Sequence, residues 1–277
     1  MVSTKYVLVL IAFAFTVIAG KLSAQSITLS EDDGDEWQYS LTAYAFVPLE
    51  TSGTSEIADT EVELDLGISE VFEVLDFTLA GRGEAWRGDW GVIADFYTVK
   101  LGPGGTLQSP GGGSLDVGID IDQHWVSVLG AYRFSRGTYG PKNRRFSWDA
   151  SAGIRWNSIT QKVSADANID IGPSVGVQNS LGGTETWFEP IVGIRGAYEV
   201  ADKWSVFGRA EIGGFGVEGD NLQYTLVLAA DWQVSSAISL SFGYQYYSIN
   251  FETERSDGAF VYDISQYGPY LGLTYNF

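Results

Sequence analysis

The chain contains no cysteine, and this absence removes several kinds of chemistry at once. Without thiols there is no disulfide framework, no thiolate metal site, no cysteine nucleophile and no cysteine for lipid attachment. Proline (7) and methionine (1) are also scarce among the 277 residues, whereas glycine (34) and aromatic residues (14%) are abundant. Because aromatic side chains favour strands over helices, this balance predicts a β-rich protein.

Basic residues are few: 16 Lys and Arg stand against 35 Asp and Glu, so the formal net charge is −19 at pH 7. Such a surface repels nucleic-acid phosphates, and we expect no nucleic-acid partner. The acidic residues serve either the solubility of exposed loops or the binding of cations between loop carboxylates. No D-x-D-x-D-G calcium loop, P-loop or dinucleotide fingerprint is present, which favours the first reading and predicts neither a metal site nor a cofactor.

Only one long apolar run occurs, from Tyr6 to Ala19, and it follows a short basic start. It is shorter than the ~20 residues that span a bilayer as a helix, and small residues follow it. We therefore predict a signal peptide over residues 1–24, with cleavage after Ala24 or, alternatively, after Ala19 or Gly20. Residues 25–36 then form an acidic periplasmic segment, and residues 37–277 form the main domain.

The main domain ends on a strictly alternating segment, Tyr267 to Phe277, with an aromatic residue as its last residue. Its odd-numbered positions are apolar and its even-numbered positions are polar or small, as expected for a strand with two different faces. A terminal strand stays ordered only when it is tied down, and a closed barrel would do so. The mean hydropathy of +0.01 fits a barrel, in which alternating faces cancel, and excludes a bundle of membrane helices.

The same period-two pattern recurs along the chain and predicts an all-β fold, a transmembrane antiparallel up-and-down barrel of about ten strands, with eight or twelve as alternatives. Short connections alternate with long ones, as in barrels with periplasmic turns and outer loops. The clearest segments are Gln38 to Val47, Phe77 to Trp86, Trp90 to Leu101, Leu115 to Phe134, Phe146 to Val163, Thr186 to Val200, Trp204 to Val217, Leu222 to Val234, Ile238 to Phe251 and Phe260 to Phe277.

One long connection, Pro48 to Asp76, has structure of its own. Glu61 to Leu66 alternates like a strand, and Ser69 begins a stretch with helical spacing of apolar residues. We expect a hairpin and one helical turn that cap the barrel mouth. If the hairpin enters the membrane instead, the strand count becomes twelve.

Side-chain parity separates an outer and an inner face. Apolar stripes from Trp148 to Trp156 and from Tyr224 to Trp232 carry aromatic residues at both ends, as membrane-facing surfaces do. The opposite parity predicts a lumen charge network of both signs, either ion-paired or lining a water-filled path; small barrels tend to fill with side chains, which favours pairing. Its members are Arg82, Glu84, Asp95, Asp149, Arg155, Glu189, Arg195, Arg209, Glu211 and Asp231.

The segment Leu115 to Phe134 does not fit a single parity. Asp120 and Asp122 share a face with Val126 and Val128. Either the acidic part stands above the membrane or a bulge near Gln123 resets the register.

With these features the chain resembles the small outer-membrane barrel proteins of Gram-negative bacteria, including the OmpA-like and OmpW-like porin relatives. The resemblance is carried by the terminal YLGLTYNF and by WGVIADFY, WSVFGRAEIG and SLSFGYQYY. It implies an outer-membrane location after signal peptide cleavage, contact with outer-membrane lipid and lipopolysaccharide, and small solutes as possible ligands. It also implies that the barrel assembly machinery reads Tyr275 and Phe277 as an assembly signal.

The only histidine provides the sole enzymatic hypothesis. Asp122 and His124 lie on one strand face, two residues apart, a spacing similar to the acid and histidine pair of the omptin surface proteases. A carboxylate beside an imidazole makes a general base that can activate water. A lone histidine in a strand is more often an ordinary strand residue. We therefore expect a non-enzymatic barrel, either a narrow pore or a structural or surface protein. The alternatives are a hydrolase that uses this pair and an acidic loop surface that binds cations.

Overall fold

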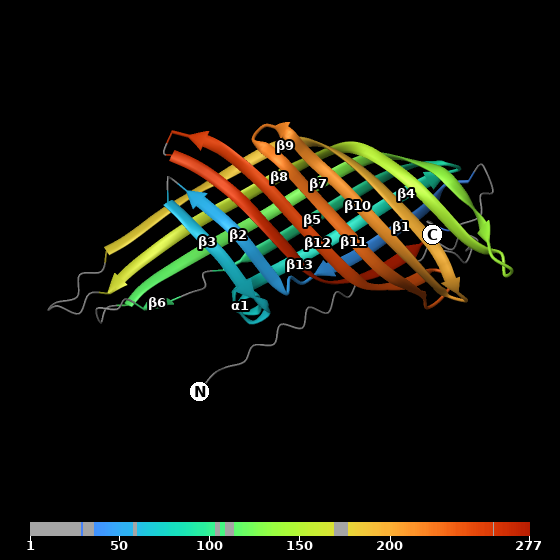
Figure 1. Cartoon of the computed structure of the whole chain (residues 1–277), viewed down its shortest axis with the longest axis horizontal. Coiled ribbons are helices and arrows are strands. Elements are labelled where there is room, and N and C mark those ends of the chain that lie inside the picture. The colour runs from blue at the N-terminus through green and yellow to red at the C-terminus, as the bar shows by residue number, and fades with distance from the viewer. Residues whose placement is uncertain are drawn as a thin grey trace.

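The computed structural model describes residues 29, 36–57, 60–102, 106–108, 114–168, 177–256 and 258–277. The predicted signal peptide, with its cleavage site, lies outside the described residues, as does nearly all of the segment 25–36. The described part consists of thirteen strands and one helix (Figure 1). No helix in these ranges is long and apolar enough to cross a bilayer.

Ten strands form a closed antiparallel barrel, in which each strand pairs with its two neighbours. Strand β1 closes it, since it pairs with β13 from Ser40↔Asn276 to Phe46↔Tyr270 and with β4 on its other side. The expected strand count and the pairing of the last strand with the first are confirmed. The ten strands are β1 (Gln38–Phe46), β4 (Leu75–Arg87), β5 (Trp90–Leu101), β7 (Ser114–Tyr139), β8 (Arg144–Asn168), β9 (Val177–Ala201), β10 (Trp204–Val217), β11 (Asp220–Gln233), β12 (Ile238–Arg255) and β13 (Gly258–Asn276).

The connection between β1 and β4 folds as the sequence predicts, into a hairpin and a helical turn. The hairpin consists of β2 (Glu50–Ile57) and β3 (Thr60–Gly67), and α1 (Ile68–Val74) follows it. Strand β2 follows β1 along the same edge of β13 and pairs with the N-terminal half of β13, from Phe260↔Ile57 to Tyr267↔Glu50. The hairpin therefore widens the sheet above β1, and its inner face reaches across the lumen to β8, where the Ser55 hydroxyl donates to the Gln161 amide oxygen at 2.8 Å.

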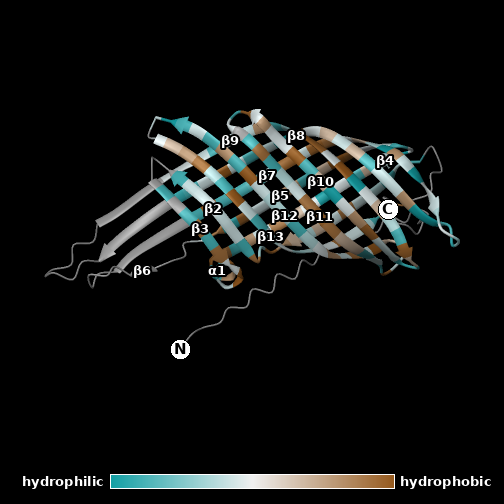
Figure 2. Cartoon of the chain, in the orientation of Figure 1, coloured by the Kyte–Doolittle hydropathy of each residue, from teal (hydrophilic) through white to brown (hydrophobic). Residues whose placement is uncertain are grey.

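Hydrophobic and hydrophilic residues alternate along the strands of the barrel wall (Figure 2), and the exposed members are largely apolar. Large apolar side chains at mid-height point away from the lumen and are exposed, including Ile154 (57%) and Leu228 (69%). Aromatic pairs gather at the end with the short turns, such as Trp90 with Tyr132, whose ring centroids are 4.7 Å apart. An exposed apolar band bordered by aromatic rings is the surface that a bilayer requires.

Strands β7, β8 and β9 are 26, 25 and 25 residues long. About 9 to 11 residues suffice to cross a bilayer, so these strands extend well beyond it. A short strand, β6 (Thr106–Gln108), pairs with the far part of β7. The register of β7 against β8 is continuous from Ser114 to Arg133, so the alternative of a bulge near Gln123 is wrong. The acidic part of β7 instead lies in the part of the wall beyond the membrane, at the end of the barrel away from the short turns. We call this part of the wall the extension; it also includes the hairpin of β2 and β3.

Candidate functional site

The lumen holds the charged residues that parity assigns to it. The structure places all ten on inner positions of six strands, β4, β5 and β8 to β11, and β7, which lies between β5 and β8, adds an eleventh. Alternation along each strand brings every second residue inward, so neighbouring strands stack their charges at similar height. The ten side chains are buried or nearly so, with exposures no greater than the 11% of Arg195. Charges buried this deeply require partners.

Glu211 is the centre of one half of the lumen charge network. Its two carboxylate oxygens accept hydrogen bonds from Arg82 at 3.2 Å and from Arg155 at 3.1 Å. Arg82 also donates to Glu84 at 2.9 Å and to Asp95 at 3.2 Å. These contacts join the strands β4, β5, β8 and β10. The two partners Arg82 and Glu211 are 129 positions apart in the chain.

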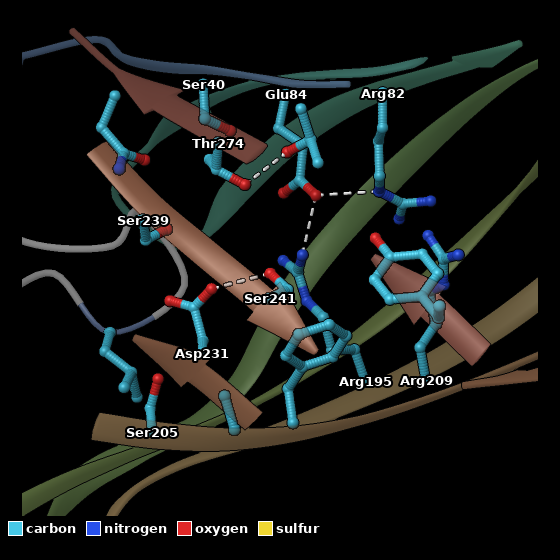
Figure 3. Close-up of a pocket in the computed structure, with 16 residues that line it drawn as sticks. Ser40, Arg82, Glu84, Arg195, Ser205, Arg209, Asp231, Ser239, Ser241 and Thr274 are labelled. Carbon is cyan, nitrogen blue, oxygen red and sulfur yellow. Dashed lines mark hydrogen bonds and ion pairs between the residues drawn. The ribbon is translucent and has the colours of Figure 1, made fainter. Parts of the chain in front are cut away.

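Asp149 is the centre of the other half. It accepts hydrogen bonds from Arg133 at 2.9 Å and from Arg195 at 2.7 Å. Arg195 in turn donates to Glu84 at 2.7 Å, which links the two halves (Figure 3). Arg133 is not among the residues predicted for the lumen. It is the last inward residue of β7 before the bulge at Arg133/Ser135, and the continuous alternation of that strand is the signal that identifies it.

Tryptophan rings line the network. The Arg133 guanidinium lies 4.5 Å from the ring centroid of Trp86, and the Trp86 indole N–H donates to Glu84 at 2.9 Å. The Arg155 guanidinium lies 5.3 Å from the Trp125 ring. Ring faces of this kind stabilise arginine where water is excluded.

Charges of the two signs balance within this network. Each arginine that the sequence analysis named has a carboxylate oxygen within 4 Å, although Arg209 reaches its partners only at 3.8 and 3.9 Å. The pairing alternative therefore describes the lumen better than a lining of free charges. The balanced set consists of the arginines 82, 133, 155, 195 and 209 and the carboxylates Glu84, Asp95, Asp149, Glu189 and Glu211.

Asp231 stands apart from the balanced set. The described residues place no arginine or lysine nitrogen within ion-pair distance of it, and it accepts a hydrogen bond from Ser241 at 2.8 Å (Figure 3). It lines a cavity of about 70 Å³ at the short-turn end of the lumen, together with Arg209, Ser239 and Asn276. This volume has room for a few water molecules, since each needs about 10 to 15 Å³.

Aromatic side chains fill the lumen on the other side of the network. Trp125 on β7 stacks on Tyr247 of β12 with ring centroids 5.3 Å apart, and Trp187 on β9 stacks on Phe251 of β12 at 3.9 Å. The Tyr247 hydroxyl accepts from the Gln123 amide at 2.8 Å. Strands β7, β9 and β12 thus meet through their side chains, and the lumen is packed at this level.

Asp122 and His124 lie on the outer wall rather than in the lumen. Thr98 on β5 is within 2.7 Å of the His124 Nδ1 atom, and the Lys100 ammonium is 3.9 Å from Asp122. Neither residue lines the cavity beside Asp231 or the two smaller cavities next to it. Nor do the described ranges hold a group of three or more His, Asp or Glu side chains that could bind a metal ion.

The outer face of the extension is acidic. Residues directly opposite one another in a sheet share a face, so the register of β12, β13, β2 and β3 fixes which side chains point outward. Among the described residues, no lysine or arginine points outward from the half of these four strands that lies away from the short turns. We name this surface the acidic face; it consists of Glu50, Glu56, Glu61, Glu63, Asp65, Glu252, Glu254 and Asp263.

The predicted assembly signal lies at the seam of the barrel. The rings of Phe277 and Tyr275 are 5.5 Å apart, and the Phe277 ring stacks on Tyr39 at 5.6 Å. The Phe277 backbone exchanges two hydrogen bonds with Tyr39, at 2.9 and 3.0 Å. Phe277 therefore helps to hold the closing strand pair, and its recognition by assembly machinery stays a prediction.

Several solved structures are similar to this chain. The outer membrane protease OmpT from Escherichia coli matches with a TM-score of 0.53 at 12% identity, over 90% of this chain and 99% of that chain. The translocator domain of the autotransporter NalP from Neisseria meningitidis matches with 0.41 at 13% identity, over 88% and 90%. The P. putida toluene transporter TodX matches with 0.31 at 11% identity, over 89% and 91%.

No protein-family model matches the chain, and no curated protein does. At 12% identity the likeness to OmpT concerns the fold and says nothing of activity. Together with the closed ring of ten antiparallel strands and its exposed apolar band, it establishes the architecture. The chain has the fold of the outer-membrane β-barrel proteins, with two strands added to one side of the barrel.

Proposed function

We propose that this protein is a non-enzymatic outer-membrane barrel with a closed lumen, and that its working surface is the extension beyond the membrane. The observation that carries the proposal is the filled cross-section: a balanced set of ion pairs is followed by stacked aromatic rings. A conducting path needs free charges or water along its whole length. Here the arginines and carboxylates are engaged with one another.

The position of Asp122 and His124 on the outer wall supports the absence of catalysis. A hydrolase needs a concave site that holds substrate against its general base. Asp122 and His124 instead lie on a convex surface beside Thr98 and Lys100. The proposal keeps outer-membrane lipid and lipopolysaccharide as partners of the apolar band and the assembly machinery as a partner of Phe277. The finer kinship with OmpA-like and OmpW-like barrels rests on the four strand motifs YLGLTYNF, WGVIADFY, WSVFGRAEIG and SLSFGYQYY alone.

The acidic face gives the extension its chemical character. In the part of the chain that the structure describes, no lysine or arginine points outward beside these eight carboxylates, and they cannot pair among themselves. Two of them accept hydrogen bonds from uncharged neighbours: Glu50 from the Tyr267 hydroxyl, and Asp263 from Asn250 at 2.8 Å. Such a surface attracts cationic partners over about 8 to 10 Å in physiological salt. We propose that the protein acts through contacts of this face.

Planar bilayer recordings test the closed lumen. The purified protein should insert without channel openings above background, and the band shift between unheated and heated gel samples should verify that it is folded. Repeated unitary openings would overturn the proposal. No turnover of a peptide panel by the wild-type protein is expected for the non-enzymatic part. Turnover that His124→Ala abolishes would contradict it in favour of the Asp122 and His124 pair, and turnover that His124→Ala leaves unchanged would contradict it while excluding that pair.

A further inference from the structure

The extension ends on one side in an edge strand. Strand β3 is the last strand of the sheet order, and in the described part of the chain it pairs only with β2, from Ile57↔Thr60 to Glu50↔Gly67 (Figure 1). An edge strand presents a row of backbone N–H and C=O groups that can pair with another extended chain. Eight residues, Thr60 to Gly67, make up this edge.

The two faces of β3 differ in chemistry. Its outward residues Glu61, Glu63 and Asp65 are all exposed. Its inward residue Leu64 is buried in the same apolar cluster as Tyr97. A strand added at this edge would therefore place alternate side chains beside three carboxylates and the others beside an apolar surface.

We propose that the β3 edge binds an extended cationic polypeptide by strand addition, with Lys or Arg at every second position and apolar residues between them. Opposite charges on neighbouring strands stabilise a sheet pair, whereas like charges destabilise it. A second copy of this chain would bring its own acidic edge against Glu61, Glu63 and Asp65, so charge disfavours it as the occupant. The inference rests on the proposed surface role and deepens it by naming the class of partner.

A peptide of alternating lysine and valine is the probe. It should bind the purified protein in lipid vesicles, and a peptide with the same residues in two blocks should bind much more weakly, because only alternation matches both faces. Removing three charge pairs worth about 0.2 to 1 kcal/mol each predicts that the E61Q/E63Q/D65N variant binds about 3-fold to about 150-fold more weakly. The matched variant E252Q/E254Q/D263N removes three charges from the same face, two strands (Asp263) and three strands (Glu252 and Glu254) away from the edge, and should retain most of the affinity.

Because the chain has no cysteine, the contact can also be located directly. Glu63→Cys creates a single thiol on β3, and a peptide with a central cysteine should form a disulfide with it when oxidised glutathione is added as the oxidant. Asp202→Cys, at a short turn where the side chain is 97% exposed, should not react preferentially. The gel band shift verifies that each variant is folded.

Several results would overturn the inference. Equal binding of the alternating and block peptides would show attraction to charge without strand addition. An equal loss of affinity in both triple variants would mean that the whole acidic face acts and the edge does not. Disulfide-linked dimers of Glu63→Cys without peptide would identify a second copy as the occupant. Absence of peptide binding by a folded, non-conducting barrel refutes the inference alone, whereas channel openings refute the closed lumen.

Discussion

Glu211→Gln is the sharpest test of the lumen charge network, because it removes one charge and almost no volume. The wild-type carboxylate, 6% exposed, accepts hydrogen bonds from Arg82 at 3.2 Å and Arg155 at 3.1 Å, and Arg209 lies 3.8 Å away. Breaking a buried ion pair by removing one partner costs about 3 to 5 kcal/mol. The glutamine oxygen preserves one of the hydrogen bonds, so we expect a loss near 3 kcal/mol, at the lower end of that range.

A second change should restore part of this loss. Arg209 is the arginine with the longest contacts, and its Nε atom has no hydrogen-bond partner. In the double variant E211Q/R209Q the network holds four arginines and four carboxylates and is balanced again. The double variant should therefore be more stable than Glu211→Gln alone, with a coupling energy of about 1 kcal/mol or more.

Urea unfolding in detergent micelles or lipid vesicles gives the measurement, with tryptophan fluorescence and the gel band shift as two probes of one transition. Asp202→Asn is the matched control, since this exposed carboxylate should contribute less than about 0.5 kcal/mol. A loss below about 1 kcal/mol for Glu211→Gln, or strict additivity in the double variant, would refute the balanced network as a source of stability.

Three further changes test other parts of the barrel. Tyr247→Phe should cost about 1 to 3 kcal/mol in urea unfolding, because the buried amide of Gln123 loses its acceptor; an unchanged midpoint would contradict that contact. Gly153→Ala should lower stability by about 1 to 3 kcal/mol, since its new methyl group would overlap a backbone carbonyl of the neighbouring strand, whereas Gly83→Ala meets only ordinary contacts and should be near neutral. Deleting Phe277 removes the ring stack and two hydrogen bonds at the seam, and the amount of heat-shifting protein in outer-membrane fractions should fall; equal amounts would remove Phe277 as an assembly determinant.

Local patterns predicted much of this fold because a barrel wall repeats one local rule. Lipid on one side and a packed lumen on the other force a period of two on every strand, so each face can be read from single segments such as Trp148 to Trp156. The hairpin and helical turn between β1 and β4 were predictable for the same reason, since Glu61 to Leu66 and Ser69 to Leu75 carry their own periodicities.

The predicted alternative of a bulge near Gln123 shows where the local rule misleads, because the strand has no bulge there. Charges on the outer face conflict with lipid, so the pattern of β7 admits either a break in register or an exit from the membrane. Only the pairing with β8, which continues without a shift past Asp122, decides for the second. The same geometry separates Asp122 and His124 from the cavity beside Asp231 and the two smaller cavities next to it.

By itself the sequence determined the barrel, a strand number of about ten, its two faces and most of the charged residues that enter the lumen, because these follow from alternation along each strand. Tertiary structure alone decided the rest. Which arginine meets which carboxylate depends on contacts such as Glu84 with Arg195, 111 positions apart, and on the closing of the ring that brings them together. Tertiary structure also decided that β3 is the edge strand of the sheet, because a strand is an edge only where no further strand pairs with it.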